Sequence, residues 1–137
     1  MGKRVKGHDY YVENMIKLRA NLIRNFSDYG DSVKVRKHNR SNKKLYGLFD
    51  ELYDEVELAS QVYSTLMKNE DPDIRQYGAT CSLIMRINVE EAVPVLEWCV
   101  ENREVPYSGG ARRRLMMFCG QIPEDTPRRP PKWRNEE

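Results

Sequence analysis

DPDIRQYGATCSLIM, residues 71 to 85, is the stretch from which we predict the fold. Asp71 suits the N-cap position of a helix, and Pro72 suits the first helical position, where its missing N–H would have no partner. Asp73 would lie at the positive end of the helix dipole. Gly78 and the alanine after it leave room for a neighbouring helix to approach closely. The face at helical spacing consists of Ile74, Tyr77, Gly78, Cys81 and Ile84.

Helical periodicity continues on both sides of this stretch. It predicts helices over about 9–28, 32–54, 56–69 and 89–102, and a last one before the Pro-rich tail. Asp9, Asn88 and Ser108 are the expected caps. Residues 34–44 are almost devoid of apolar side chains, so the first half of the second helix either projects into solvent or frays. We therefore predict an all-α fold of about six helices.

An internal repeat indicates how these helices pair. VELASQVYSTLMKN, residues 56–69, aligns with VEEAVPVLEWCVEN, residues 89–102, after a shift of 33 positions, and five of the fourteen aligned residues are identical. A repeat in the thirties that is made of paired helices is typical of an α-solenoid, in which each unit buries its apolar face against its neighbours.

The two repeated segments also resemble a known repeat type. Residues 71–84 resemble the first helix of a HEAT-type repeat, with an Asp-Pro cap, Ile74, Arg75 and then small residues. Residues 89–100 resemble the second helix, with Pro94 inside it. Further matching positions are residues 30–31, 38–40 and 109–110.

Over about residues 9–120, the chain is similar to a small bacterial family of unknown function with a truncated HEAT-like fold. The resemblance implies antiparallel helix pairs in a short α-solenoid, and it implies that Asp71 and Arg75 tie adjacent units together. We expect one HEAT-like domain over residues 1–121 and a Pro/Arg-rich tail over residues 122–137. The tail is expected to be disordered rather than an ordered clasp.

Composition excludes several classes of function. The chain of 137 residues has no apolar run of the roughly 20 residues that a bilayer span needs, and its basic N-terminus lacks the apolar stretch of a signal peptide. We therefore expect a cytoplasmic protein that makes no contact with a membrane. Three widely spaced cysteines suggest neither a disulfide framework nor a zinc site, and we expect all of them to be buried thiols: Cys81, Cys99 and Cys119.

Catalysis is not expected. His8 and His38 both lie in basic neighbourhoods without an evident carboxylate partner, so surface histidines are the favoured interpretation. The sequence contains no phosphate-binding loop, no paired-cysteine motif and no set of residues at metal-ligand spacing. We therefore expect no enzyme activity, no cofactor and no metal.

The net charge of +2 conceals a strong asymmetry. Residues 1–48 carry +8, residues 49–104 carry −9, and residues 105–137 carry +3. Charge of this kind affects partners and association rates rather than the fold. The basic segment is either a solvated face that pairs with the acidic half of the chain or a nucleic-acid site. The candidate phosphate-binding residues are Lys34, Arg36, Lys37, Arg40, Lys43, Lys44, Arg112 and Arg113.

The helix over residues 89–102 raises a further hypothesis. With about 100° per residue, Trp98 and Pro94 fall opposite the apolar stripe formed by Val89, Ala92, Val93, Leu96, Cys99 and Val100. Trp98 is then either an exposed anchor for a partner or a residue that the tail covers. The candidate protein-binding residues are Trp98, Glu90, Glu91, Glu97, Glu101 and Pro94.

An aromatic anchor surrounded by carboxylates suits a partner with a basic surface. We expect a non-enzymatic protein-interaction module, and an immunity protein that masks a basic nuclease toxin is its sharpest form. The alternative is a nucleic-acid-associated protein that uses residues 34–44 and 112–114. A third interpretation is self-association through an exposed end of the solenoid.

Overall fold

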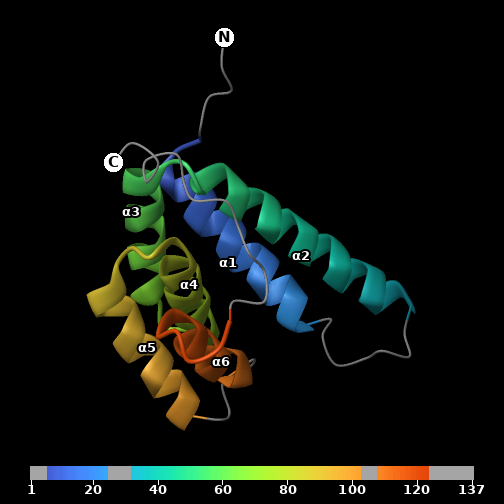
Figure 1. Ribbon diagram of the computed structural model, residues 1–137. Helices are drawn as coiled ribbons and strands as arrows, with labels where there is room; N and C mark the ends of the chain where they lie inside the picture. Colours follow the sequence, from blue (N-terminus) through green and yellow to red (C-terminus); the bar gives the residue numbers. More distant parts are fainter. Residues whose placement is uncertain (1–5, 25–31, 103–107, 124–137) are drawn as a thin grey trace.

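A computed structural model describes residues 6–24, 32–102 and 108–123 of the chain. The described residues contain no strand and form six helices (Figure 1): α1 (His8–Arg24), α2 (Ser32–Leu52), α3 (Val56–Met67), α4 (Pro72–Met85), α5 (Val89–Glu101) and α6 (Ser108–Phe118). The predicted all-α class is therefore confirmed.

The six helices are arranged in two parts around α4. The two longest helices, α1 and α2, lie side by side and form one side of the molecule, while α3 to α6 form the other side (Figure 1). α4 packs against α3, α5 and α6, and α1 contacts α3 as well as α2. The arrangement places α2 and α5 on opposite edges of the molecule.

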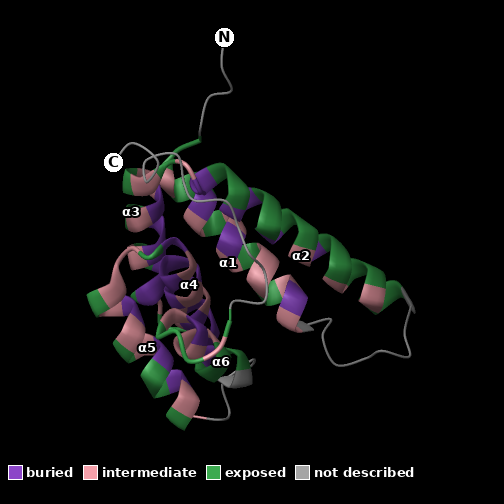
Figure 2. Cartoon of the chain, viewed as in Figure 1, coloured by how far each residue is buried: buried purple, intermediate pink, exposed green. Residues whose placement is uncertain are grey.

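Two clusters of buried side chains hold the helices together, and α4 contributes to both (Figure 2). The first cluster joins α1, α2, α3 and α4 around Tyr11, Phe49, Tyr63 and Leu66. The second joins α4 to α5 and α6 and includes Met67, Ala79, Leu83, Ala92, Leu96, Cys99 and Ala111. α4, together with Met67 at the end of α3, therefore connects the two halves of the core.

The start and the middle of α4 follow the sequence prediction. The carboxylate of Asp71 accepts a hydrogen bond of 2.9 Å from the backbone N–H of Asp73, and proline occupies the first turn. A Cβ atom added at Gly78 would lie 2.8 Å from Cβ of Leu66 and 2.9 Å from the carbonyl oxygen of Tyr63. The close approach of α3 to α4 therefore requires glycine at this position.

Other predicted helix ends differ from the structure. α1 begins at His8 rather than after Asp9, and α6 begins at Ser108 itself. Asn88 occupies the N-cap position of α5, but its side chain makes no capping hydrogen bond, and its backbone is left-handed with φ 50°. α2 and α3 end earlier than predicted, at Leu52 and Met67. The predicted continuation of the first helix to residue 28 lies outside the described residues.

Burial also departs from the prediction at a few positions. Cys81 and Cys99 are buried, but Cys119 is exposed because it follows the last residue of α6. Tyr11, near the start of α1, is fully buried. Three valines on the predicted apolar face of α5 are only half-buried: Val89, Val93 and Val100. All three lie on one side of that face, and the fully buried Ala92, Leu96 and Cys99 lie on the other side.

None of the helices in the described part of the chain is both long and apolar enough to cross a membrane. Within the same residues, no cluster of three or more histidine, cysteine or acidic side chains has a geometry that could hold a metal ion.

Candidate functional site

The outer face of α5 presents an acidic surface with an aromatic side chain. Trp98 is 43% exposed, and the other exposed residues at this spacing are Glu90, Pro94, Glu97 and Glu101. These five residues fall within about 100° on the helix and form one stripe along its length. α5 contains no lysine or arginine, so the stripe is uniformly acidic. We refer to these five residues as the α5 stripe.

Glu91, the fourth candidate carboxylate, has a different position. It is half-buried, and its two carboxylate oxygens lie 3.1 and 3.2 Å from the Ser64 hydroxyl, which donates to them from α3. Glu91 therefore joins α3 to α5, and it belongs to the packing between helices more than to the exposed surface.

Arg75 of α4 supports the indole of Trp98. Its guanidinium carbon lies 5.2 Å from the centroid of the Trp98 ring, which is a cation–π distance. Its Nη1 donates to the carbonyl oxygens of Asn69, at 2.8 Å, and Glu70, at 3.0 Å. Arg75, Trp98, Pro94 and the half-buried Val95 line a shallow groove.

These contacts also bear on the role that the HEAT resemblance implies for two residues. Arg75 bonds to the connection between α3 and α4, and Asp71 caps α4. Both side chains therefore stabilise the turn between two successive helices. Since Arg75 is held at its Nη1 by backbone carbonyls, it presents a fixed surface to Trp98.

The basic segment, residues 34–44, lies far from the α5 stripe. Its side chains are exposed on α2, which packs mainly on α1, whereas α5 packs on α4 and α6 (Figure 1). The acidic stripe of α5 is therefore not the surface on which α2 packs. The exposed candidate phosphate-binding residues are Lys34, Arg36, Lys37, Arg40, Lys43, Lys44, Arg112 and Arg113.

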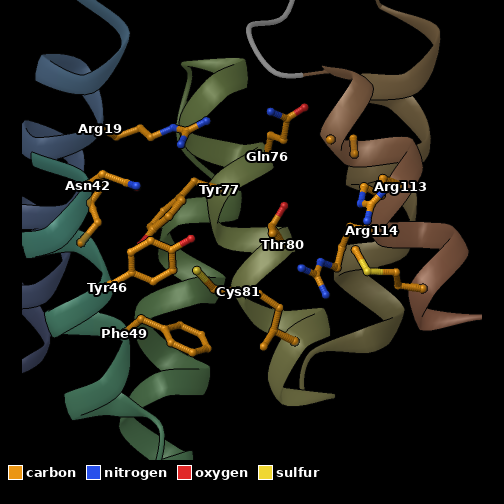
Figure 3. Close-up of a pocket in the computed structure, with 15 residues that line it drawn as sticks. Arg19, Asn42, Tyr46, Phe49, Gln76, Tyr77, Thr80, Cys81, Arg113 and Arg114 are labelled. Carbon is orange, nitrogen blue, oxygen red and sulfur yellow. The ribbon is translucent and has the colours of Figure 1, made fainter. Parts of the chain in front are cut away.

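A cavity of about 320 Å³ separates α2 from α6 and has α4 as its floor (Figure 3). Tyr46 and Phe49 of α2 and Tyr77 of α4 contribute aromatic rings to it, and Arg113 and Arg114 enter from α6. The fold thus brings the end of the basic segment 34–44 close to the arginines of α6. The sequence analysis did not predict this cavity. A signal for it is Tyr46, an aromatic residue that lies outside the buried face of α2 and is 54% exposed.

The two histidines are partly as expected. His38 is half-buried on α2. His8 does have a carboxylate neighbour, contrary to expectation, because its Nδ1 lies 2.8 Å from Oδ1 of Asp9. Its Nε2 lies 2.7 Å from the hydroxyl oxygen of Thr65 in α3. The contact between His8 and Thr65 ties the start of α1 to α3. Since the Asp9 side chain is 90% exposed, His8 and Asp9 do not form an enclosed acid–base site.

Comparisons with family models, with curated proteins and with solved structures found no significant match to this chain.

Proposed function

We propose that this protein is a non-enzymatic interaction module that binds a basic surface of a partner protein through the α5 stripe. The observation that carries the proposal is the exposed Trp98 beside three exposed glutamates on a helix without any basic residue. Tryptophan is enriched at the centres of protein interfaces because it buries a large area with little loss of conformational entropy.

The setting of Trp98 supports a role as an anchor. The Arg75 guanidinium lies over its ring and is itself held by two backbone carbonyls, so the indole rests on a fixed support. An anchor that is ordered before binding loses less entropy when a partner covers it. The shallow groove beside the ring gives a partner side chain a place to insert.

Charge narrows the class of partner. Glu90, Glu97 and Glu101 would attract lysine- or arginine-rich surfaces and would repel acidic ones. Nuclease toxins carry such basic surfaces because they bind phosphate backbones. An immunity protein that masks a nuclease toxin is therefore the specific form of the proposal, and the resemblance to a HEAT-like bacterial family is part of the same hypothesis.

The test is affinity capture from nuclease-treated host lysate with the wild-type chain and two variants of the α5 stripe, Trp98→Ala and Glu97→Lys. Tyr46→Ala is the matched control, because Tyr46 is also an exposed aromatic residue and lies on α2, at the opposite edge. We expect a basic protein that wild type and Tyr46→Ala retain and that both α5 variants lose. Equal retention by all four chains would contradict the proposal.

A second candidate function is binding of nucleic acid through α2 and α6. The observation in its favour is the cavity that brings α6 with Arg113 close to α2 and its exposed basic side chains. Such binding would weaken steeply with salt, because it depends on the release of counterions from phosphates. Arg113→Ala and Lys43→Ala would weaken it and Trp98→Ala would not, so the two candidates are separable.

Self-association is a third outcome of the same architecture. A basic helix on one edge and an acidic helix on the other are complementary between two copies of the chain. Sedimentation over a range of concentrations, at low and high salt, would detect it. If α5 meets α2 of a second copy, Glu97→Lys would abolish the association.

A further inference from the structure

The charged side chains that line the cavity between α2, α4 and α6 are all positive. The described lining includes Arg19, Arg113 and Arg114, and it includes no aspartate or glutamate. Arg19 is already engaged by the carboxylate of Asp73, which accepts two hydrogen bonds of 2.9 Å from its guanidinium. The other two guanidinium groups of the lining come from α6.

Arg114 has a donor that the surrounding protein does not use. Its Nε is buried, and among the described residues it has no hydrogen-bond partner. A buried guanidinium N–H without an acceptor is unfavourable, since it has lost its hydration without replacement. The charge of Arg114 reaches the floor of the cavity, where it acts to lower the pKa of Cys81 against the larger raising effect of burial. Arg114 also lines the cavity, so an oxyanion bound there would meet a guanidinium whose hydrogen-bonding capacity the protein does not fully use.

The wall opposite Arg114 is aromatic. Tyr46, Phe49 and Tyr77 face the arginines of α6 across the cavity (Figure 3). The Arg19 guanidinium carbon lies 5.5 Å from the centroid of the Tyr77 ring, a cation–π distance that supports the orientation of the ring. Tyr46 is 54% exposed and lies at the edge of the cavity, which leaves a route for a ligand to enter from solvent.

Aromatic rings on one side and guanidinium groups on the other select a ligand with two matching ends. A flat ring would stack on the tyrosines, and a planar or tetrahedral oxyanion would accept paired hydrogen bonds from arginine. Thr80, Gln76 and Asn42 add polar side chains at the floor and edges. The volume of about 320 Å³ is at the small end of the range for ligand sites, so the ligand must be small.

We propose that this cavity binds a small ring-bearing oxyanion, with its ring against Tyr46 and Tyr77 and its carboxylate or phosphate against Arg113 and Arg114. This site is separate from the α5 stripe, so the proposal stands or falls independently of the proposed function.

The test is calorimetric titration of the full chain with three probes that share one ring system: 2-naphthoate, 2-naphthyl phosphate and the neutral 2-naphthamide. We expect saturable binding of at least one of the two anions and at least about tenfold weaker binding of the amide, because the amide lacks the charge that strengthens hydrogen bonds to arginine. The tighter of the two anions identifies whether the natural ligand is a carboxylate or a phosphate.

Variants on a single helix provide the control. Arg114→Gln should weaken the anion by about tenfold or more, whereas Arg112→Gln should leave it unchanged, since Arg112 is exposed on α6 and does not line the cavity. Tyr46→Ala should also weaken binding of the anion, and the variant should fold because the ring is exposed. Thermal melting checks that each variant is folded.

Three results would overturn the proposal. These are no saturable binding of either anion, equal binding of the amide, and equal loss of affinity in Arg112→Gln and Arg114→Gln. If Arg114→Gln does not fold, Tyr46→Ala serves as the test variant. Unchanged affinity of Tyr46→Ala for the anion would then exclude the site.

Discussion

Arg19 of α1 and Asp73 of α4 form a buried ion pair with two parallel hydrogen bonds, although they are 54 positions apart in the sequence. Nε and Nη2 of the guanidinium donate to the two carboxylate oxygens at 2.9 Å each. The side chains are only 12% and 5% exposed. The pair joins the α1–α2 side of the molecule to α4, and it lies beside the cavity that Arg19 helps to line.

Arg19→Ala should destabilise the protein in a pH-dependent way. Burial raises the pKa of Asp73 above its ordinary value of 3.8, and the hydrogen bonds and charge of Arg19 oppose that rise. Without Arg19 the pKa of Asp73 would rise further. At pH 7 the variant would bury an unpaired carboxylate, and we expect this to lower the free energy of unfolding by about 3–5 kcal/mol. At about pH 4 the carboxyl can take up a proton, so the loss should be smaller.

The direction of the pH dependence follows from the difference between the pKa of Asp73 in the folded and in the unfolded chain. A carboxyl whose pKa is raised in the folded state binds its proton more tightly there than in the unfolded chain. Its contribution to stability is therefore largest below the unfolded pKa and is lost as the pH rises through the folded pKa. Urea denaturation at both pH values measures the difference, with Lys17→Ala, an exposed change on the same helix, as the control. An equal loss at both pH values would argue against this account.

Two glycines should respond to alanine in opposite directions. Gly78→Ala would place a Cβ 2.8 Å from Cβ of Leu66 and 2.9 Å from the backbone oxygen of Tyr63, and backbone cannot move aside easily. We expect a loss of about 1–3 kcal/mol from this overpacking. Gly47→Ala, in an exposed position of α2 with no atom nearby, should stabilise by about 0.5–1 kcal/mol through helix propensity. Chemical denaturation of both variants tests the pair, and a gain in stability at Gly78 would contradict the close approach of α3.

Asn88 should tolerate glycine better than alanine. Its Oδ1 accepts from the Ser60 hydroxyl at 2.7 Å, and its Nδ2 donates to the Ser60 carbonyl oxygen at 3.0 Å. Both substitutions lose these hydrogen bonds, but only alanine retains a Cβ in a left-handed backbone with φ 50°. We expect Asn88→Ala to lose about 2–3 kcal/mol and Asn88→Gly about 1 kcal/mol less. Equal melting temperatures for the two variants would mean that the left-handed backbone contributes nothing.

The three cysteines should differ in reactivity with a maleimide. Cys119 is exposed, whereas Cys81 and Cys99 are buried. Burial raises the pKa of Cys81 to about 12 and also raises that of Cys99, so neither forms the reactive thiolate readily at neutral pH. Mass spectrometry of the native protein should show a single adduct, and the unfolded protein should show three. Cys119→Ser is the control, and an adduct on that native variant would mean that the core opens.

The sequence predicted those features of the fold that depend on neighbouring residues. The cap at Asp71 and the need for a small residue at Gly78 are both visible in one short stretch and both present in the structure. The outward position of Trp98 also follows from helical spacing alone, and the structure leaves its side chain 43% exposed. Each of these depends on the helical period and on the backbone groups at a helix end, which act over only a few residues.

Features that depend on distant residues did not follow from local patterns. Asn88 was expected to cap its own helix, yet its side chain bonds to Ser60, 28 positions earlier. The N-cap position is encoded locally, but the partner of the side chain depends on how close α3 lies. Burial of Tyr11 also depends on distant residues, because α1 must meet the core that α2, α3 and α4 share.

The sequence by itself thus determined the helices, most of their inward faces and the acidic stripe of α5, because periodicity and capping are local. Only the tertiary structure decided that Arg19 pairs with Asp73 and that Arg114 faces Tyr46 and Tyr77 across a cavity. Charges and rings on separate helices become neighbours only after packing has set the distances between those helices, and no period in the sequence encodes those distances.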